Sequence, residues 1–137
     1  MVTRGAGEVR FAGVHCTLSV RDYAGVVVMK ISGTDIGEFG DAPMLELAKC
    51  VDVAGTVELF IDARDVRGAS IEVSGDWAEW MRAHKDRLRG INMLTGSRFV
   101  EVTAEFVRRF AGLQGTMRIY TEAAAFDAAL EGSLTQL

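Results

Sequence analysis

The sequence predicts an α/β domain in which N-terminal antiparallel strands precede alternating βα units on a mixed sheet, with helices packed against it. The stretch 57–63 is almost continuously apolar and rich in β-branched and aromatic residues, which is typical of a strand buried on both faces. Amphipathic helical patterns lie on both sides of this stretch, and short alternating segments precede residue 32. From the first helix onward, the alternation requires parallel strands joined by right-handed crossovers.

Length and composition are those of one globular domain spanning 1–137. The chain has 137 residues, of which 49% are apolar and 25% are charged. Its formal net charge of -4 argues against a nucleic-acid surface or an anionic membrane surface. No apolar run approaches the ~20 residues of a membrane span, and the start lacks an apolar signal segment, so we expect a cytoplasmic protein. Cys16 and Cys50 indicate neither a disulfide framework nor a metal site, and we expect reduced thiols and no cofactor.

The N-terminal part is predicted to be a small antiparallel meander. Residues 1–7 are expected to be a frayed and flexible terminus. Two strands of alternating character are joined by a hairpin turn, a short strand can precede them, and a glycine-rich loop follows them. The two strands are 14–20 and 26–31, and the turn between them is 21–25. The short first strand is 8–12, and the glycine-rich loop is 32–40.

Two amphipathic helices flank the central strand. The first has Asp41 as its N-cap, Pro43 in its first turn, and Gly55 at its left-handed end. Its apolar stripe consists of Met44, Leu47, Ala48 and Val51. The second is expected over about 74–89, closed by Gly90 and followed by a strand. Its apolar face consists of Val73, Trp77, Trp80, Met81, His84 and Leu88, and the strand is 91–95.

The third helix has the clearest amphipathic pattern, with Ser97 as its N-cap. Its predicted inner face consists of Phe99, Thr103, Phe106, Val107, Phe110 and Leu113, and Phe106 and Phe110 are expected to be core residues. Its predicted outer face consists of Arg98, Glu101, Glu105, Arg108 and Arg109. A last strand over 117–120 and a short helix capped by Thr121 follow, and the tail from Gly132 to residue 137 is expected to be flexible.

Three stretches together resemble a known group of proteins. Segment 27–35 ends in Gly33-Thr34-Asp35, segment 57–66 contains IDARDV, and segment 84–88 is followed by INMLTGS. In this order they resemble the STAS superfamily, the fold of bacterial anti-sigma-factor antagonists, and more narrowly its SpoIIAA-like group. The likeness covers roughly residues 9–131 in element order.

The resemblance implies a binding module without enzymatic activity. Antagonists of this family dock on a partner kinase and are switched off by phosphorylation of a serine in an Asp-Ser-Ser-Gly-like motif. The motif is absent from the corresponding segment, 67–74. If Asp62 and Asp65 are aligned, the phosphoacceptor position falls at Ile71, and Ser70 one residue earlier is not a matched phosphosite.

Other groups of reactive side chains have structural interpretations that we favour. Asp62 and Asp65, at i and i+3 of a strand end, are not expected to share a face, which argues against an acid/base or metal pair. His84 has no second histidine or carboxylate at ligand spacing. Trp77 and Trp80 could form an aromatic platform for a ligand, but they share the stripe of the second helix and are interpreted as core residues.

We predict that the working surface lies in the loop and helix start from 64 to 76. This segment follows the central strand at its C-terminal end, where α/β sheets gather functional loops. An ordinary polar connection is the alternative interpretation. The residues predicted to bind a protein partner are Arg64, Asp65, Arg67, Ser70, Glu72, Ser74 and Asp76.

Two classes of function remain, with an enzyme a distant third. The first is a regulatory protein-interaction module. The second is a small-ligand or lipid carrier or sensor with a pocket under 33–40 and 64–76, although a lipid-sized pocket is hard to fit beside a core in 137 residues. A homodimer is also predicted, because the apolar face of the third helix extends to Val100 and Val102, one of which should be exposed, and the meander offers an edge strand.

Overall fold

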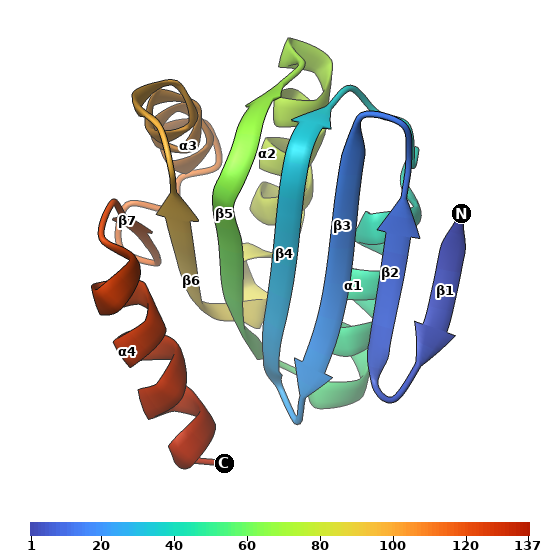
Figure 1. The fold of residues 1–137 in the computed structure, drawn as a ribbon. Coiled ribbons are helices and arrows are strands. Elements are labelled where there is room, and N and C mark those ends of the chain that lie inside the picture. The colour runs from blue at the N-terminus through green and yellow to red at the C-terminus, as the bar shows by residue number, and fades with distance from the viewer.

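In the computed structural model, which describes residues 1–137, seven strands form one mixed sheet whose spatial order follows the chain (Figure 1). The strands are β1 (Val2–Gly5), β2 (Glu8–Ala12), β3 (Cys16–Tyr23), β4 (Val26–Asp35), β5 (Val57–Ala69), β6 (Leu88–Thr95) and β7 (Met117–Tyr120). Neighbouring strands are antiparallel from β1 to β4 and parallel from β4 to β7. The predicted fold class is therefore confirmed.

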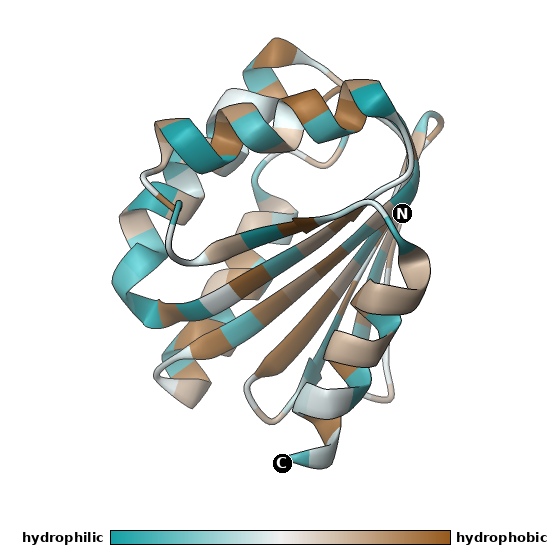
Figure 2. Cartoon of the chain, turned by 90° about the vertical axis from the view of Figure 1, so that its left-hand side faces the viewer, coloured by the Kyte–Doolittle hydropathy of each residue, from teal (hydrophilic) through white to brown (hydrophobic).

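Four α-helices cover the two faces of the sheet unequally. They are α1 (Ala42–Ala54), α2 (Ile71–His84), α3 (Arg98–Phe110) and α4 (Ala123–Thr135). The first three lie on one face and bury the main core, which includes Leu59 and Ile61 of β5 (Figure 1). Only α4 lies on the other face (Figure 2). There the Phe126 ring centroid is 5.7 Å from those of Phe60 and Tyr120. The central strand is thus buried on both faces, as its apolar run predicts.

A short strand replaces the frayed terminus expected at 1–7. Ala6 and Gly7 have φ angles of 48° and 77°, which fits a two-residue hairpin turn, and β1 pairs along its whole length with β2. Arg4 of β1 donates a hydrogen bond to Glu46 of α1 at 2.5 Å. This bond lowers the pKa of the Glu46 carboxyl, so the terminus is tied to the first helix by an ion pair.

The second helix begins earlier than predicted. It starts at Ile71 because Ser70 caps it: the Ser70 hydroxyl accepts a hydrogen bond from the backbone amide of Val73 at 3.1 Å. Leu88, which the pattern placed in this helix, instead lies in β6 and pairs with Val57. Leu88 is buried in either assignment, so burial alone could not separate the two.

The last helix is longer than predicted and begins differently. Its N-cap is Glu122 rather than Thr121, and the cap forms no side-chain hydrogen bond. The helix continues to Thr135, past Gly132, where a flexible tail was expected. Alanine and leucine, which are good helix formers, make up most of the helix before Gly132.

The inner face of α3 differs from the predicted one. The buried residues are Val100, Ala104 and Val107, whereas Phe106 and Phe110 are 52% and 48% exposed. The prediction that these two phenylalanines are core residues is therefore wrong. Both sets of residues repeat with helical spacing, and the smaller side chains allow α3 to approach the sheet closely.

Candidate functional site

An irregularity in β5 brings two carboxylates to the same side of the sheet. Lys30 pairs with Asp62 and Ser32 pairs with Asp65, so two steps along β4 match three along β5. This β-bulge turns Asp65 toward the face that carries Asp62, and both line a polar hollow on the uncovered part of the sheet. The expectation that the two aspartates do not share a face is wrong, because it assumed a regular strand.

The carboxylate of Asp62 is paired with Arg64. The backbone amide and Nε of Arg64 donate to Asp62 Oδ1 at 3.2 and 3.0 Å, and the same guanidinium donates to Asp127 of α4 at 3.0 Å. Asp62 is almost fully buried, so this pairing offsets much of the cost of burying its charge. We interpret Asp62 and Arg64 as a link between β5 and α4.

The residues of the predicted working surface fall in three places. Arg64 and Asp65 lie where β5 continues past its predicted end, beside the uncovered part of the sheet. A second group is exposed or half-buried where β5 ends and α2 begins, and consists of Arg67, Ser70, Glu72 and Asp76. Four of the seven residues therefore lie within one short stretch of the chain, which also contains Ile71, whose side chain is 93% exposed.

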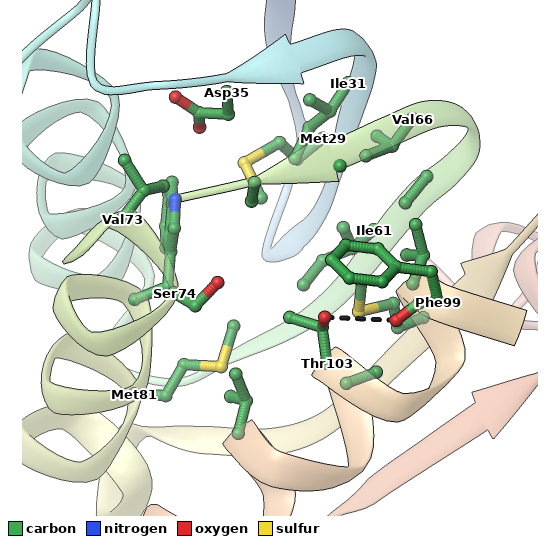
Figure 3. Close-up of a pocket in the computed structure, with 18 of the residues that line it drawn as sticks. Met29, Ile31, Asp35, Ile61, Val66, Val73, Ser74, Met81, Phe99 and Thr103 are labelled. Atoms are coloured by element: carbon green, nitrogen blue, oxygen red, sulfur yellow. Dashed lines mark hydrogen bonds between the residues drawn. The ribbon is translucent and has the colours of Figure 1, made fainter. Parts of the chain in front are cut away.

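Ser74 does not belong to this surface. It is only 8% exposed, because a helix that starts at Ile71 turns residue 74 inward with Ala78 and Met81, at i+4 and i+7. Its side chain points into an apolar cavity (Figure 3). The helix start that was missed in the sequence is the reason for this correction.

The cavity lies between α2, α3 and the sheet, and has a volume of about 90 Å³. Fifteen of its 19 lining residues are hydrophobic. Four methionines contribute to the wall, and Phe99 of α3 lies over it (Figure 3). The methionines are Met29, Met81, Met93 and Met117. Pockets that hold drug-sized ligands measure roughly 300–1,000 Å³, so this cavity has room only for a small apolar group.

Three polar side chains interrupt the apolar wall: Asp35, Ser74 and Thr103. Asp35 is buried and accepts a hydrogen bond from the Gly37 amide at 3.1 Å, while the Thr103 hydroxyl donates to the Phe99 carbonyl at 3.1 Å. Asp35 also lines an adjacent hollow beside the start of α1. The aspartate of the Gly33-Thr34-Asp35 motif therefore lies between the cavity and the surface.

The cysteines and His84 show the features of structural residues. Burial is the main cause that raises the pKa of the Cys16 thiol to about 12 and that of Cys50 to about 11, which keeps both thiols protonated at neutral pH. The His84 ring lies 2.8 Å through Nδ1 from the Trp80 carbonyl oxygen and stacks on the Trp80 ring, with a centroid distance of 4.2 Å. No group of three or more metal-ligating side chains is present.

Sequence reasoning missed the methionine wall of the cavity. Met29, Met93 and Met117 each stood in an apolar strand segment and carried no signal of their own. Their shared feature is that their strands lie beneath α2 and α3, which only the tertiary fold shows. Four of the chain's six methionines line this one cavity, a grouping that no local sequence pattern contains.

Comparisons with known proteins support the fold. No protein-family model and no curated protein matches the sequence. An uncharacterised protein with a SpoIIAA-like fold from Shewanella loihica is similar in structure, with a TM-score of 0.57, 16% identity, and coverage of 88% of this chain and 98% of that one. An anti-sigma factor antagonist from Mycobacterium paratuberculosis is also similar, with a TM-score of 0.51, 23% identity, and coverage of 85% and 94%.

These likenesses concern the whole arrangement of strands and helices rather than one motif, since each spans more than four fifths of both chains. At identities this low they establish the fold alone. No helix of the chain is long and apolar enough to cross a bilayer. The chain has the SpoIIAA-like fold that its resemblance to the STAS superfamily implies.

Proposed function

We propose that the chain is a non-enzymatic regulatory module that binds a protein partner, as its structural relative among the anti-sigma factor antagonists suggests. The observation that carries this proposal is the shared fold over 85% of the chain. The partner is proposed to be a bacterial regulatory protein of the kind that such antagonists bind, met in the cytoplasm. No cofactor and no nucleic acid are needed for this role.

We place the docking surface where β5 ends and α2 begins, at Arg67, Ser70, Ile71, Glu72 and Asp76. An apolar side chain that is 93% exposed, with charged residues near it in the sequence, is typical of a small protein interface. Ile71 is that side chain here. Its exposure has no use in the packing of the chain itself, because its neighbours Val73 and Ser74 supply the buried side of the helix.

The phosphoserine switch of the antagonists has no counterpart at the aligned position. Ile71 has no hydroxyl, and the Ser70 hydroxyl already accepts a hydrogen bond from the Val73 amide as the N-cap of α2. Glu72 follows within the first turn, where its negative charge would repel a phosphate on Ser70. We therefore propose that the aligned position is not a phosphorylation switch and that Ser70 serves as the N-cap of α2.

A pull-down from the native host, followed by titration with the purified partner, tests the docking surface. Arg67→Glu and Ser70→Asp are exposed or half-buried changes, and aspartate is also a good N-cap, so stability should change by no more than ~0.5 kcal/mol. Binding should weaken at least tenfold, which is ~1.4 kcal/mol. Arg82→Glu, near the far end of α2, is the matched control and should bind normally. Unchanged binding by both folded variants would contradict this location.

A second candidate function is the binding of a small apolar ligand, and the cavity lined by methionines favours it. The Ser74 hydroxyl points into that cavity and could hold one polar group of the ligand (Figure 3). At about 90 Å³ the cavity excludes a lipid unless α2 and α3 separate. This candidate predicts that a small molecule copurifies with the protein and is detected by native mass spectrometry.

Xenon under pressure is a direct probe of the cavity, because dry apolar cavities bind it. The methyl signals of Met29 and Met93 should shift in NMR spectra of the wild type. Ala104→Leu places a larger side chain in the cavity wall and should abolish the shifts. Shifts that persist in this variant, or none in the wild type, would count against a ligand site here.

A further inference from the structure

The outer side of α3 carries a row of half-exposed apolar side chains that the chain itself does not cover. We call this row the α3 stripe; it consists of Phe99, Val102, Phe106 and Phe110, which are 60%, 54%, 52% and 48% exposed. The Phe106 and Phe110 rings stack on each other, with a centroid distance of 5.8 Å. Hydrophobic residues alternate with charged ones along this helix (Figure 2). Contiguous apolar surface of this kind marks an interface.

Charges of both signs border the stripe. Arg98 pairs with Glu101 at 3.1 Å, and Glu105 holds Arg108 through both carboxylate oxygens at 2.7 Å. Arg109 is exposed and forms no ion pair with another residue of the chain. One surface depression along the helix is lined by Arg98, Glu101, Val102, Glu105, Phe106, Arg109 and Phe110. The helix therefore offers apolar contacts together with one free cation.

We propose that the stripe binds a second copy of this chain, with the two α3 helices antiparallel around a two-fold axis near residues 104–105. The two-fold rotation brings apolar residues of one helix opposite apolar residues of the other, and an acidic residue opposite a basic one. Phe99 meets Phe110 of the second copy, and Val102 meets Phe106. Glu101 meets the unpaired Arg109. The midpoints of these three pairs lie within one residue of each other along the sequence.

Any apolar stripe with helical spacing matches itself when the helix is reversed, so the apolar pairs alone do not identify the occupant. The opposite charges of Glu101 and Arg109, which reversal brings to the same level, are what favour a second copy over an unrelated protein. The one like-charged pair near the axis is Glu105 with its own copy, and Arg108 already neutralises that carboxylate within the chain. The overall net charge of -4 also disfavours an anionic lipid surface as the occupant.

The size of the contact sets the expected affinity. Three half-exposed phenylalanines on each copy supply roughly 600 Å² of aromatic surface in total, which is below the ~1,200 Å² of standard stable interfaces. We therefore expect a weak dimer that dissociates at micromolar concentration or above. The stripe begins close to the proposed docking surface, because the Phe99 ring lies beside Gly68 near the end of β5.

Sedimentation velocity on the full chain from low micromolar to high micromolar concentration tests the dimer. The wild type should shift from monomer to dimer over this range. Phe106→Glu should remain monomeric at least tenfold higher in concentration while keeping the circular dichroism spectrum and melting temperature of the wild type. Arg118→Glu, an exposed change on β7, is the control and should dimerise like the wild type. A strict monomer at the highest concentration overturns the proposal, whatever else the stripe binds.

Charge reversal tests the antiparallel register. Glu101→Arg and Arg109→Glu should each weaken the dimer, because each leaves two like charges facing each other across the axis. The double variant Glu101→Arg/Arg109→Glu restores opposite charges at both places and should recover the dimer in large part. A double variant as weak as the single ones, or single variants equal to the wild type, overturns the register.

Discussion

Gly33 shows how a single residue shapes the candidate site. Its φ angle is 86°, in the left-handed region, and a Cβ added there would clash with the His15 carbonyl oxygen. That same oxygen accepts a hydrogen bond from the Thr34 amide at 2.8 Å. The bend at Gly33 therefore lets β4 lie close to the loop before β3, and it directs Asp35 to the mouth of the cavity.

Gly33→Ala is predicted to be strongly destabilising. The strained φ and the clash with backbone atoms together should lower the free energy of unfolding by at least ~2 kcal/mol. Gly132→Ala is the matched control, since a Cβ there meets no atom within 4 Å and the residue lies within α4. That change should be neutral or stabilising by up to ~1 kcal/mol. Urea denaturation of both variants measures the difference, and equal stabilities would show that Gly33 is not needed for its conformation.

At the scale of elements, α3 shows what periodicity can and cannot determine. The sequence predicted its start and its Ser97 cap correctly, and the Ser97 hydroxyl accepts a hydrogen bond from the Val100 amide at 3.2 Å. It did not determine which of two apolar stripes faces the sheet. Phenylalanine is the more hydrophobic choice, but smaller residues pack where helix and sheet approach closely.

Paired alanine substitutions distinguish the two stripes of α3. Phe106→Ala removes a half-exposed side chain and should cost less than ~1 kcal/mol, although buried phenylalanines typically cost ~3–5 kcal/mol. Val107→Ala removes a buried side chain and should cost ~1–3 kcal/mol despite its smaller size. Thermal and chemical denaturation at low protein concentration, where the chain is monomeric, gives both values. A larger loss for Phe106 than for Val107 would restore the face predicted from the sequence.

The strands and helices near the working surface were predicted less well than the central strand. The apolar run at 57–63 identified β5, because a strand buried on both faces needs no alternation. Its extension to Ala69 could not be predicted, since polar residues in an exposed strand look like a loop. The bulge that places Asp62 and Asp65 on one face depends on pairing with β4, which a local pattern does not contain. Ser70 carried a capping signal that was available but was not used.

At the scale of the whole molecule, the two faces of the sheet are covered by different numbers of helices. Three helices cover one face, whereas α4 is the only helix on the other. The second core consists of Val26, Phe60, Leu94, Tyr120 and Phe126. Four of these five residues come from strands, so the core lies on the sheet and α4 serves as its cover (Figure 1). The sequence predicted a last helix here but not the separate face of the sheet that it covers.

Because α4 alone covers the second core, we predict that the side chain of Phe126 is its largest single contribution to the stability of the fold. Phe126 is 1% exposed and its ring centroid lies 5.7 Å from those of two other aromatic rings, so Phe126→Ala should lower the free energy of unfolding by ~3–5 kcal/mol.

A chain truncated after residue 121 should lose at least as much stability and should bind a hydrophobic dye, because Phe60 and Leu94 become exposed. Asp127→Ala tests the ion pair with Arg64 separately and should cost less than ~1 kcal/mol. Since α4 lies on the opposite face of the sheet from α2 and contributes no residue to the cavity, partner binding by Phe126→Ala below its melting temperature should equal that of the wild type. A truncated chain that unfolds at the same urea concentration as the full chain would show that the second core does not stabilise the sheet.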